Sequence, residues 1–192
     1  MIPYDLWAEI DLGAIEHNVG ALKSCLSRGT GLMAVVKADG YGHGARQSAL
    51  AALRAGADCL AVARLGEALE LRNAGIDCPV LIFGRTRPEL IHKLLHYDLI
   101  QSVFSRDYAL CLSSGARAAG RRLRVHVNVD TGMGRLGVLG VPAAGGSTGV
   151  KDAADAIEAV CGLEGLAAEG IYTHFATADE RDKTRARRQL EL

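Results

Sequence analysis

Residues 34–44 of the chain read Ala34-Val35-Val36-Lys37-Ala38-Asp39-Gly40-Tyr41-Gly42-His43-Gly44. Three apolar residues run directly into Lys37, and a turn rich in glycine follows. Burying an ammonium group is unfavourable unless the group is paired or loses its proton. A lysine at the end of a buried strand is therefore a candidate nucleophile that can form a Schiff base. The alternative is a surface lysine that merely ends a strand.

The segments that follow repeat this pattern of a short apolar run and then a helix. Glycines such as Gly56, Gly75 and Gly120 follow the helical patterns, as is typical of helix C-termini. The predicted strands span residues 32–36, 59–63, 80–83, 99–104, 123–129 and 170–175. The predicted helices span residues 12–26, 45–55, 67–73, 107–119 and 152–160, and two more begin near Arg87 and Glu180.

This alternation of strands and helices, without hairpin signals, predicts a parallel sheet covered by helices. A doubly wound open sheet and a (β/α)8 barrel both have this pattern. We favour the barrel because the polar motifs follow the carboxyl ends of predicted strands, where barrels place their active sites. A dinucleotide-binding sheet would carry GxGxxG at its first turn after a strand, and that pattern is absent there.

The predicted fold class is therefore α/β, a (β/α)8 TIM-type barrel that is truncated after about six β–α units. A complete barrel takes about 250 residues, and this chain has 192.

The composition argues against several kinds of partner. The 22 basic and 22 acidic residues balance, so neither a nucleic acid nor a membrane surface is expected to bind. No apolar run has the length of a membrane-spanning helix, and the N-terminus lacks the apolar core of a signal peptide.

Five cysteines are scattered along the chain without a CxxC motif or a Cys/His cluster. This spacing predicts neither a disulfide framework nor a metal site. We expect small buried thiols in a cytoplasmic protein.

Three motifs resemble those of the alanine racemases, which are pyridoxal-phosphate (PLP) enzymes built from a barrel and a β-domain. They are Lys37-Ala-Asp-Gly-Tyr-Gly-His-Gly44, Val129-Asp-Thr-Gly-Met-Gly-Arg-Leu-Gly137 and Gly170-Ile-Tyr-Thr-His-Phe-Ala-Thr-Ala-Asp-Glu180. They occur in the order found in the family, and the resemblance extends from Trp7 to Glu180. It implies the barrel, PLP as the cofactor, and interconversion of L- and D-alanine to supply D-alanine for peptidoglycan.

The resemblance also implies a division of the chain. Residues 1–11, with an alternating pattern from Leu6 to Asp11 that predicts a short strand, would pair with a missing C-terminal β-domain. Residues 12–192 would form an incomplete PLP-binding (β/α) barrel domain. We therefore expect the N-terminal part of a longer enzyme, inactive alone, whose full-length form is a homodimer.

By resemblance, Lys37 forms the internal aldimine with PLP and serves as the catalytic base. Tyr41 and His174 line the cofactor site, and Arg135 binds the cofactor's phenolic oxygen and the substrate carboxylate. The residues alone leave other interpretations open. Tyr41 is then a half-buried tyrosine that closes a turn, His174 a core histidine, and Arg135 a surface arginine in a flexible turn.

Asn128 departs from the pattern of many alanine racemases, which carry a lysine there, often carbamylated, whose negative charge orients the arginine. Some members with asparagine at this position, which this sequence resembles, use a bound anion such as chloride instead. The resemblance therefore implies an anion site between Asn128 and Arg135. The histidine that matches His174 bonds an arginine from the next strand, which lies beyond Leu192. Asp179 and Glu180 match the family and are expected to cap the last helix.

Other functions remain compatible with the motifs. A serine racemase, or a racemase of broader specificity, shares all three. A single-domain PLP-carrier protein would explain a short chain. Such proteins, however, have a closed barrel and lack the motifs around Lys37 and Arg135. An inactive scaffold fragment is the third alternative.

Overall fold

The computed structural model describes residues 6–140 and 149–192. The chain divides into two compact units, Met1–Leu81 and Ile82–Leu192.

The first unit is built around a pair of parallel strands. Met33, Ala34 and Val35 of β1 pair with Cys59, Leu60 and Ala61 of β2. The elements of this unit are α1 (Leu12–Ser24), β1 (Met33–Val35), α2 (Lys37–Tyr41), α3 (Ala45–Arg54), β2 (Cys59–Val62) and α4 (Leu65–Asn73), and β3 (Val80–Ile82) begins here.

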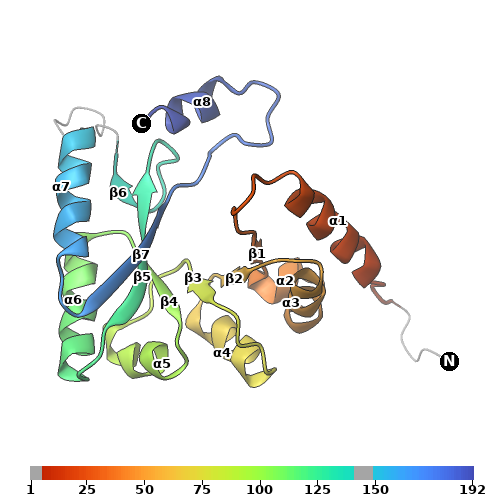
Figure 1. Cartoon of the computed structure of the whole chain (residues 1–192), viewed down its shortest axis with the longest axis horizontal. Coiled ribbons are helices and arrows are strands. Elements are labelled where there is room, and N and C mark those ends of the chain that lie inside the picture. The colour runs from red at the N-terminus through yellow and green to blue at the C-terminus, as the bar shows by residue number, and fades with distance from the viewer. Residues whose placement is uncertain (1–5, 141–148) are drawn as a thin grey trace. The chain divides into compact units, whose positions relative to one another are not determined.

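Small side chains let α3 pack closely in the core of this unit. Ala49 and Ala51 of α3 are fully buried, as are Leu60 and Val62 of β2. The Arg54 side chain also pairs with Glu16 of α1 at 2.6 Å, and Figure 1 shows α1 beside α3. The core of this unit is therefore aliphatic.

The second unit contains a parallel sheet centred on β5. This strand pairs in parallel with β4, with β7 and, at its carboxyl end, with β6. The register of β5 with β7 shifts between Val125 and His126, which marks an irregularity in the ladder. The remaining elements are η1 (Pro88–Leu90), α5 (Ile91–His96), β4 (Ile100–Val103), α6 (Arg106–Ala118), β5 (Leu123–Asp130), β6 (Val138–Leu139), α7 (Val150–Cys161), β7 (Leu166–Tyr172) and α8 (Thr184–Leu190).

Helices α6 and α7 pack on this sheet, one above the other at the left of Figure 1. The Ser105 side chain caps α6 by accepting a hydrogen bond from Tyr108 N at 3.3 Å. Helical spacing then buries Tyr108, Leu112 and Ala116 on one face. The strands predicted between residues 32 and 175 and the predicted helices are thus present in the two units, and the fold is of the parallel α/β class.

Residues 6–11 contain no strand here, and Trp7 is 60% exposed. A strand needs a partner to pair with, so the predicted pairing of this segment with a C-terminal β-domain stays a prediction. Three other local expectations were wrong. The last strand begins at Leu166 rather than residue 170 and ends at Tyr172. The last helix begins at Thr184, and its first amide is capped by Asp182 at 2.9 Å rather than by the two acidic residues expected. Cys25, Cys111 and Cys161 are exposed, whereas Cys59 and Cys78 are half-buried.

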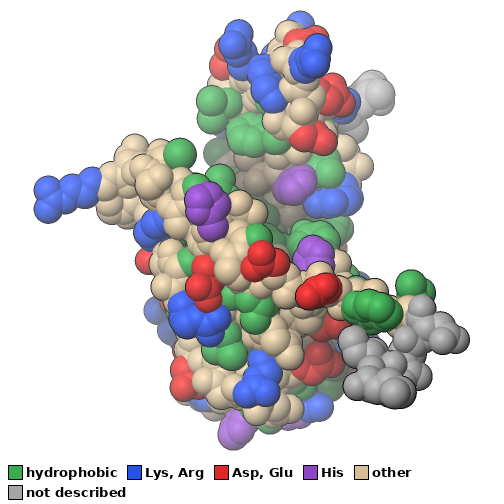
Figure 2. Space-filling view, turned by 90° about the vertical axis from the view of Figure 1, so that its right-hand side faces the viewer, with side chains coloured by type: hydrophobic (Ala, Val, Ile, Leu, Met, Phe, Trp, Pro, Cys, Tyr) green, Lys and Arg blue, Asp and Glu red, His purple; other side chains and the backbone are tan. Residues whose placement is uncertain are grey.

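Acidic and basic side chains are mixed on the face that Figure 2 shows, in keeping with the balanced charge. Within the described ranges, no helix has the length and apolar character needed to cross a lipid bilayer.

Candidate active site

Lys37 lies two residues after the end of β1, at the start of the short helical segment α2. Its side chain is half-buried and the preceding Val36 is buried, whereas Val35 at the end of β1 is 36% exposed, so β1 is not the fully buried strand that the sequence predicted. The Lys37 Nζ lies 5.7 Å from the centroid of the Tyr41 ring. This distance is within the range in which an ammonium group is attracted to an aromatic face. The structure therefore brings together the two residues that the sequence predicted in this loop.

The backbone after Lys37 forms a left-handed turn. The φ angles are 51° at Ala38, 53° at Asp39, 61° at Gly40 and 57° at Tyr41. A non-glycine residue in this region is disfavoured by roughly 1–2 kcal/mol. Glycine also suits position 40 because space there is tight: a Cβ would lie 3.1 Å from Ser48 Oγ and 3.3 Å from the Ala45 backbone.

Two carboxylates hold this strained turn. Asp39 Oδ1 accepts a hydrogen bond from Ala45 N at 2.7 Å, which closes the turn onto the start of α3. Glu67 Oε1 accepts from Ala38 N at 2.8 Å. Sequence reasoning missed the role of Glu67, although its place three residues into a helix that follows a strand is a signal for a capping carboxylate.

In the second unit, Asp130 organises the loop that carries Arg135. This carboxylate is buried at the end of β5 and accepts from Gly132 N at 2.9 Å, Gly134 N at 3.0 Å and Arg135 N at 2.8 Å. Burial alone would raise the pKa of Asp130, but these backbone amides outweigh it and lower the pKa below its ordinary value of 3.8. Asp130 is therefore ionised near neutral pH and fixes the loop.

Asn128 is buried two residues earlier on β5. Its Nδ2 donates to Leu136 O at 3.0 Å, so the asparagine also ties down the loop. Its Oδ1 is buried without a hydrogen-bond partner among the described residues. The Arg135 side chain is exposed, and its positive charge acts on the phenol of Tyr172, whose pKa burial raises.

His174 lies two residues beyond β7, where its side chain is exposed. It is therefore not a core histidine. Its backbone carbonyl accepts from Gln189 Nε2 at 3.0 Å, and the same amide donates to Thr131 Oγ1 at 3.1 Å. The buried Gln189 of α8 thus joins the ends of β5 and β7, a contact that no motif predicted.

The candidate residues fall into two groups. Lys37 and Tyr41 lie in the first unit. Asn128, Arg135 and His174 lie in the second, on or just beyond the neighbouring strands β5 and β7, where Asn128 pairs with Tyr172.

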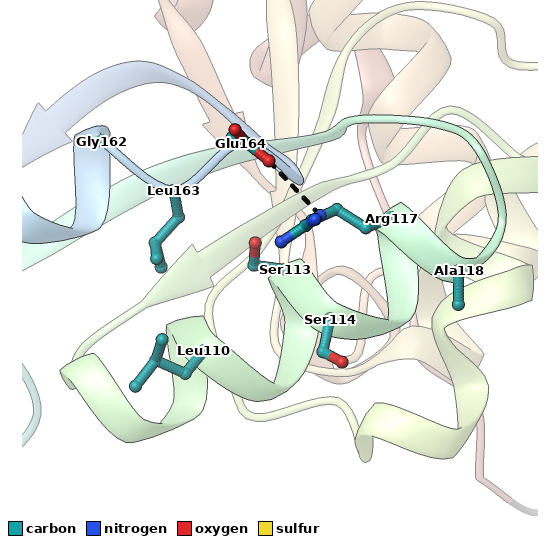
Figure 3. Close-up of a pocket in the computed structure, with 8 residues that line it drawn as sticks. All are labelled: Leu110, Ser113, Ser114, Arg117, Ala118, Gly162, Leu163 and Glu164. Atoms are coloured by element: carbon teal, nitrogen blue, oxygen red, sulfur yellow. Dashed lines mark ion pairs between the residues drawn. The ribbon is translucent and has the colours of Figure 1, made fainter.

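A hollow of about 790 Å³ in the second unit is not part of this site. It lies between α6 and the segment that leads into β7, and Figure 3 shows Ser113, Ser114, Arg117 and Glu164 at its edge. Arg117 pairs with Glu164 at 3.5 Å, and both side chains are largely exposed. The hollow is open and lies at the amino end of β7, opposite to the end where parallel α/β folds place their chemistry.

Comparison with known proteins identifies the family. Residues 10–192 match the sequence model described as "Alanine racemase, N-terminal domain". The chain belongs to the alanine racemase family. An alanine racemase of Desulfosudis oleivorans is 48% identical over 193 residues, which cover 100% of this chain and 49% of that relative. The chain thus spans about half the length of the curated relatives it matches.

Solved alanine racemase structures have the same fold. An alanine racemase from Clostridium difficile 630, in complex with cycloserine, superposes with a TM-score of 0.89 at 34% identity and covers 100% of this chain and 50% of that chain. The chain therefore has the parallel α/β fold of this family's N-terminal barrel domain and spans about half of this structure. A histidine racemase from Leuconostoc mesenteroides also superposes, with a TM-score of 0.83 at 27% identity, covering 95% of this chain and 46% of that chain.

Proposed function

We propose that this chain is the N-terminal part of a PLP-dependent racemase that interconverts L- and D-alanine and supplies D-alanine for peptidoglycan. The observation that carries the proposal is the half-buried primary amine of Lys37, which follows β1 on a left-handed turn beside the Tyr41 ring. The family membership supports the reaction class.

The donor set fits PLP. Lys37 offers the primary amine that an aldehyde cofactor requires, and Arg135 offers a guanidinium fork for a phenolate or a carboxylate. When bound, PLP supplies an electron sink for the substrate's α-carbon. We propose that Lys37, Tyr41, Arg135 and His174 hold it.

The roles of these side chains follow from their chemistry. The Lys37 amine takes the α-proton and returns it on one face of the substrate. The Arg135 guanidinium holds the substrate carboxylate, and the Asp130-bound loop keeps the Arg135 backbone in place. A second proton donor must serve the opposite face. We propose that it comes from the part of the relatives that this chain does not cover, in a cytoplasmic homodimer whose β-domain pairs with residues 1–11.

We further propose that an anion such as chloride lies between Asn128 and Arg135. Asn128 carries no charge, and its Nδ2 keeps one hydrogen beyond the one given to Leu136 O. The test is bromide soaking of crystals of the complete gene product. An anomalous peak between these two residues is expected, and a site holding only water would overturn the proposal.

A second candidate function differs from the first in the amino acid substrate. A histidine racemase shares this fold over 95% of the chain, so the N-terminal half is compatible with more than one substrate. A racemase acting on serine or another amino acid is therefore the alternative. Racemisation assays of the complete gene product with alanine, serine and histidine distinguish these possibilities.

Borohydride reduction after incubation with PLP, followed by peptide mass mapping, tests the site itself. We expect a cofactor adduct on Lys37, lost in Lys37→Arg together with about a thousandfold or more of the racemisation rate. Lys151→Arg, an exposed position on α7, is the matched control and should leave both unchanged. Adducts spread over many lysines of the complete protein, or none, would contradict the proposed function.

A further inference from the structure

We propose that Glu67 is a positioning residue that sets the direction of the Lys37 side chain. The inference rests on the proposed function, because it assigns a role toward the amine that would hold PLP. It concerns contacts within the first unit only.

The Glu67 carboxylate accepts hydrogen bonds from backbone N–H groups of two separate segments. Its Oε1 accepts from Ala38 N at 2.8 Å, directly after Lys37. Its Oε2 accepts from Ala63 N at 2.7 Å and from Arg64 N at 3.0 Å, directly after β2. One half-buried carboxylate therefore joins the ends of two adjacent parallel strands.

Only part of this arrangement is needed for capping a helix. A carboxylate in the first turn of α4 caps the helix when it accepts from the backbone at the cap, here Arg64 N. The other hydrogen bond joins Glu67 to Ala38 N, 29 residues away in sequence. It does not cap α4. Oε2 thus binds the backbone just before α4, and Oε1 binds the turn that follows Lys37.

The lysine turn needs this external support because its conformation is disfavoured. Positive φ angles from Ala38 to Tyr41 persist only where surrounding contacts impose them. Asp39 fixes the far end of the turn onto Ala45, and Glu67 fixes the near end, next to the amine. If the Glu67 contact is lost, the turn is free to relax, and both the Lys37 amine and the Tyr41 ring then lose their fixed directions.

Glu67→Gln removes the contact selectively. A glutamine has one acceptor oxygen and one NH2 group. If the glutamine oxygen accepts from Ala63 N and Arg64 N, two of the three hydrogen bonds are kept. The NH2 group then faces the Ala38 N–H, and two donors cannot form a hydrogen bond. Glu70→Gln, on an exposed position one turn later in α4, is the matched control with the same change of charge.

The experiment uses the complete gene product and has two readouts. Hydrogen exchange followed by NMR should show Ala38 N–H exchanging at least tenfold faster in Glu67→Gln, with Arg64 N–H unchanged. Racemisation should show kcat lowered 10- to 100-fold with KM within twofold, because misdirection of the amine affects the reacting step more than substrate binding. Glu70→Gln should match the wild type in both.

The two proposals fail differently. If the wild type gives no Lys37 adduct with PLP and no racemisation, the proposed function fails. If the wild type does both and Glu67→Gln behaves as Glu70→Gln does, the positioning role is overturned and the function stands. Should Glu67→Gln not fold, the wild type alone decides: an Ala38 N–H that exchanges as fast as an exposed amide would overturn the role, and one as protected as Ala63 N–H supports it.

Discussion

At the scale of single residues, the second unit depends on a buried charge. Asp130 accepts three backbone hydrogen bonds in the loop that carries Arg135. These bonds lower the pKa of Asp130 below 3.8 in the folded chain, despite the opposing effect of burial. The stability that they contribute is therefore fully present above the unfolded pKa and is lost as the pH falls through the lower folded value.

Asp130→Asn tests this dependence. The amide keeps one acceptor oxygen and loses the charge, so we expect it to unfold about 2 kcal/mol more easily near pH 7. Urea denaturation between pH 7 and pH 3 should show this difference shrinking as the pH falls through 3.8, because the unfolded chain takes up the proton at a higher pH than the folded chain does. A difference that is constant over the whole range would show that the charge of Asp130 does not stabilise the loop.

At the scale of elements, the loop after β5 is shaped by two glycines with different constraints. Gly137 has φ 146°, and a Cβ there would lie 2.4 Å from Asp130 N, closer than real Cβ atoms approach backbone. Gly134 has φ 74° and open space around the position of a Cβ. Only Gly137 is required by both backbone conformation and close packing.

Gly137→Ala and Gly134→Ala therefore form a matched pair. Gly134→Ala should lose about 1 kcal/mol of unfolding free energy from its positive φ alone. Gly137→Ala should lose roughly 3 kcal/mol or more, because β5 and β6 must separate locally to admit the methyl group. Equal losses, measured by urea denaturation, would contradict the packing argument.

At the scale of the whole molecule, the cysteines differ in exposure. Cys25, Cys111 and Cys161 are exposed, and Cys59 and Cys78 are half-buried. Burial is the main cause that raises the pKa of both half-buried thiols above the ordinary value of 9.0. Since the thiolate is the reactive form, these two should react slowly at neutral pH.

Alkylation with iodoacetamide, followed by peptide mass spectrometry, measures this difference. At pH 8 the three exposed cysteines should be modified at least tenfold faster than the other two. Raising the pH above 9.0 should speed the alkylation of Cys59 and Cys78, whose pKa values are raised. In concentrated urea all five should react at similar rates, which controls for sequence effects. Five equal rates in the native chain would be inconsistent with the described burial.

The sequence by itself determined the class of fold and the candidate residues. Short apolar runs that alternate with helical periodicity predict parallel strands and covering helices, because burial on both faces requires that pattern. The sequence motifs around Lys37, Arg135 and His174 predicted that these polar residues follow the carboxyl ends of strands. Their chemical roles remain proposals.

Only the tertiary structure decided how these motifs are held. The left-handed path after Lys37 depends on Glu67, 29 residues away from Ala38, and the ends of β5 and β7 are joined by Gln189 of α8. Such contacts have no local pattern, because they form between segments that the sequence separates widely. Burial of the cysteines was mispredicted for the same reason. A thiol in an apolar segment is buried only if another element packs over it, and three of the five lie on the surface.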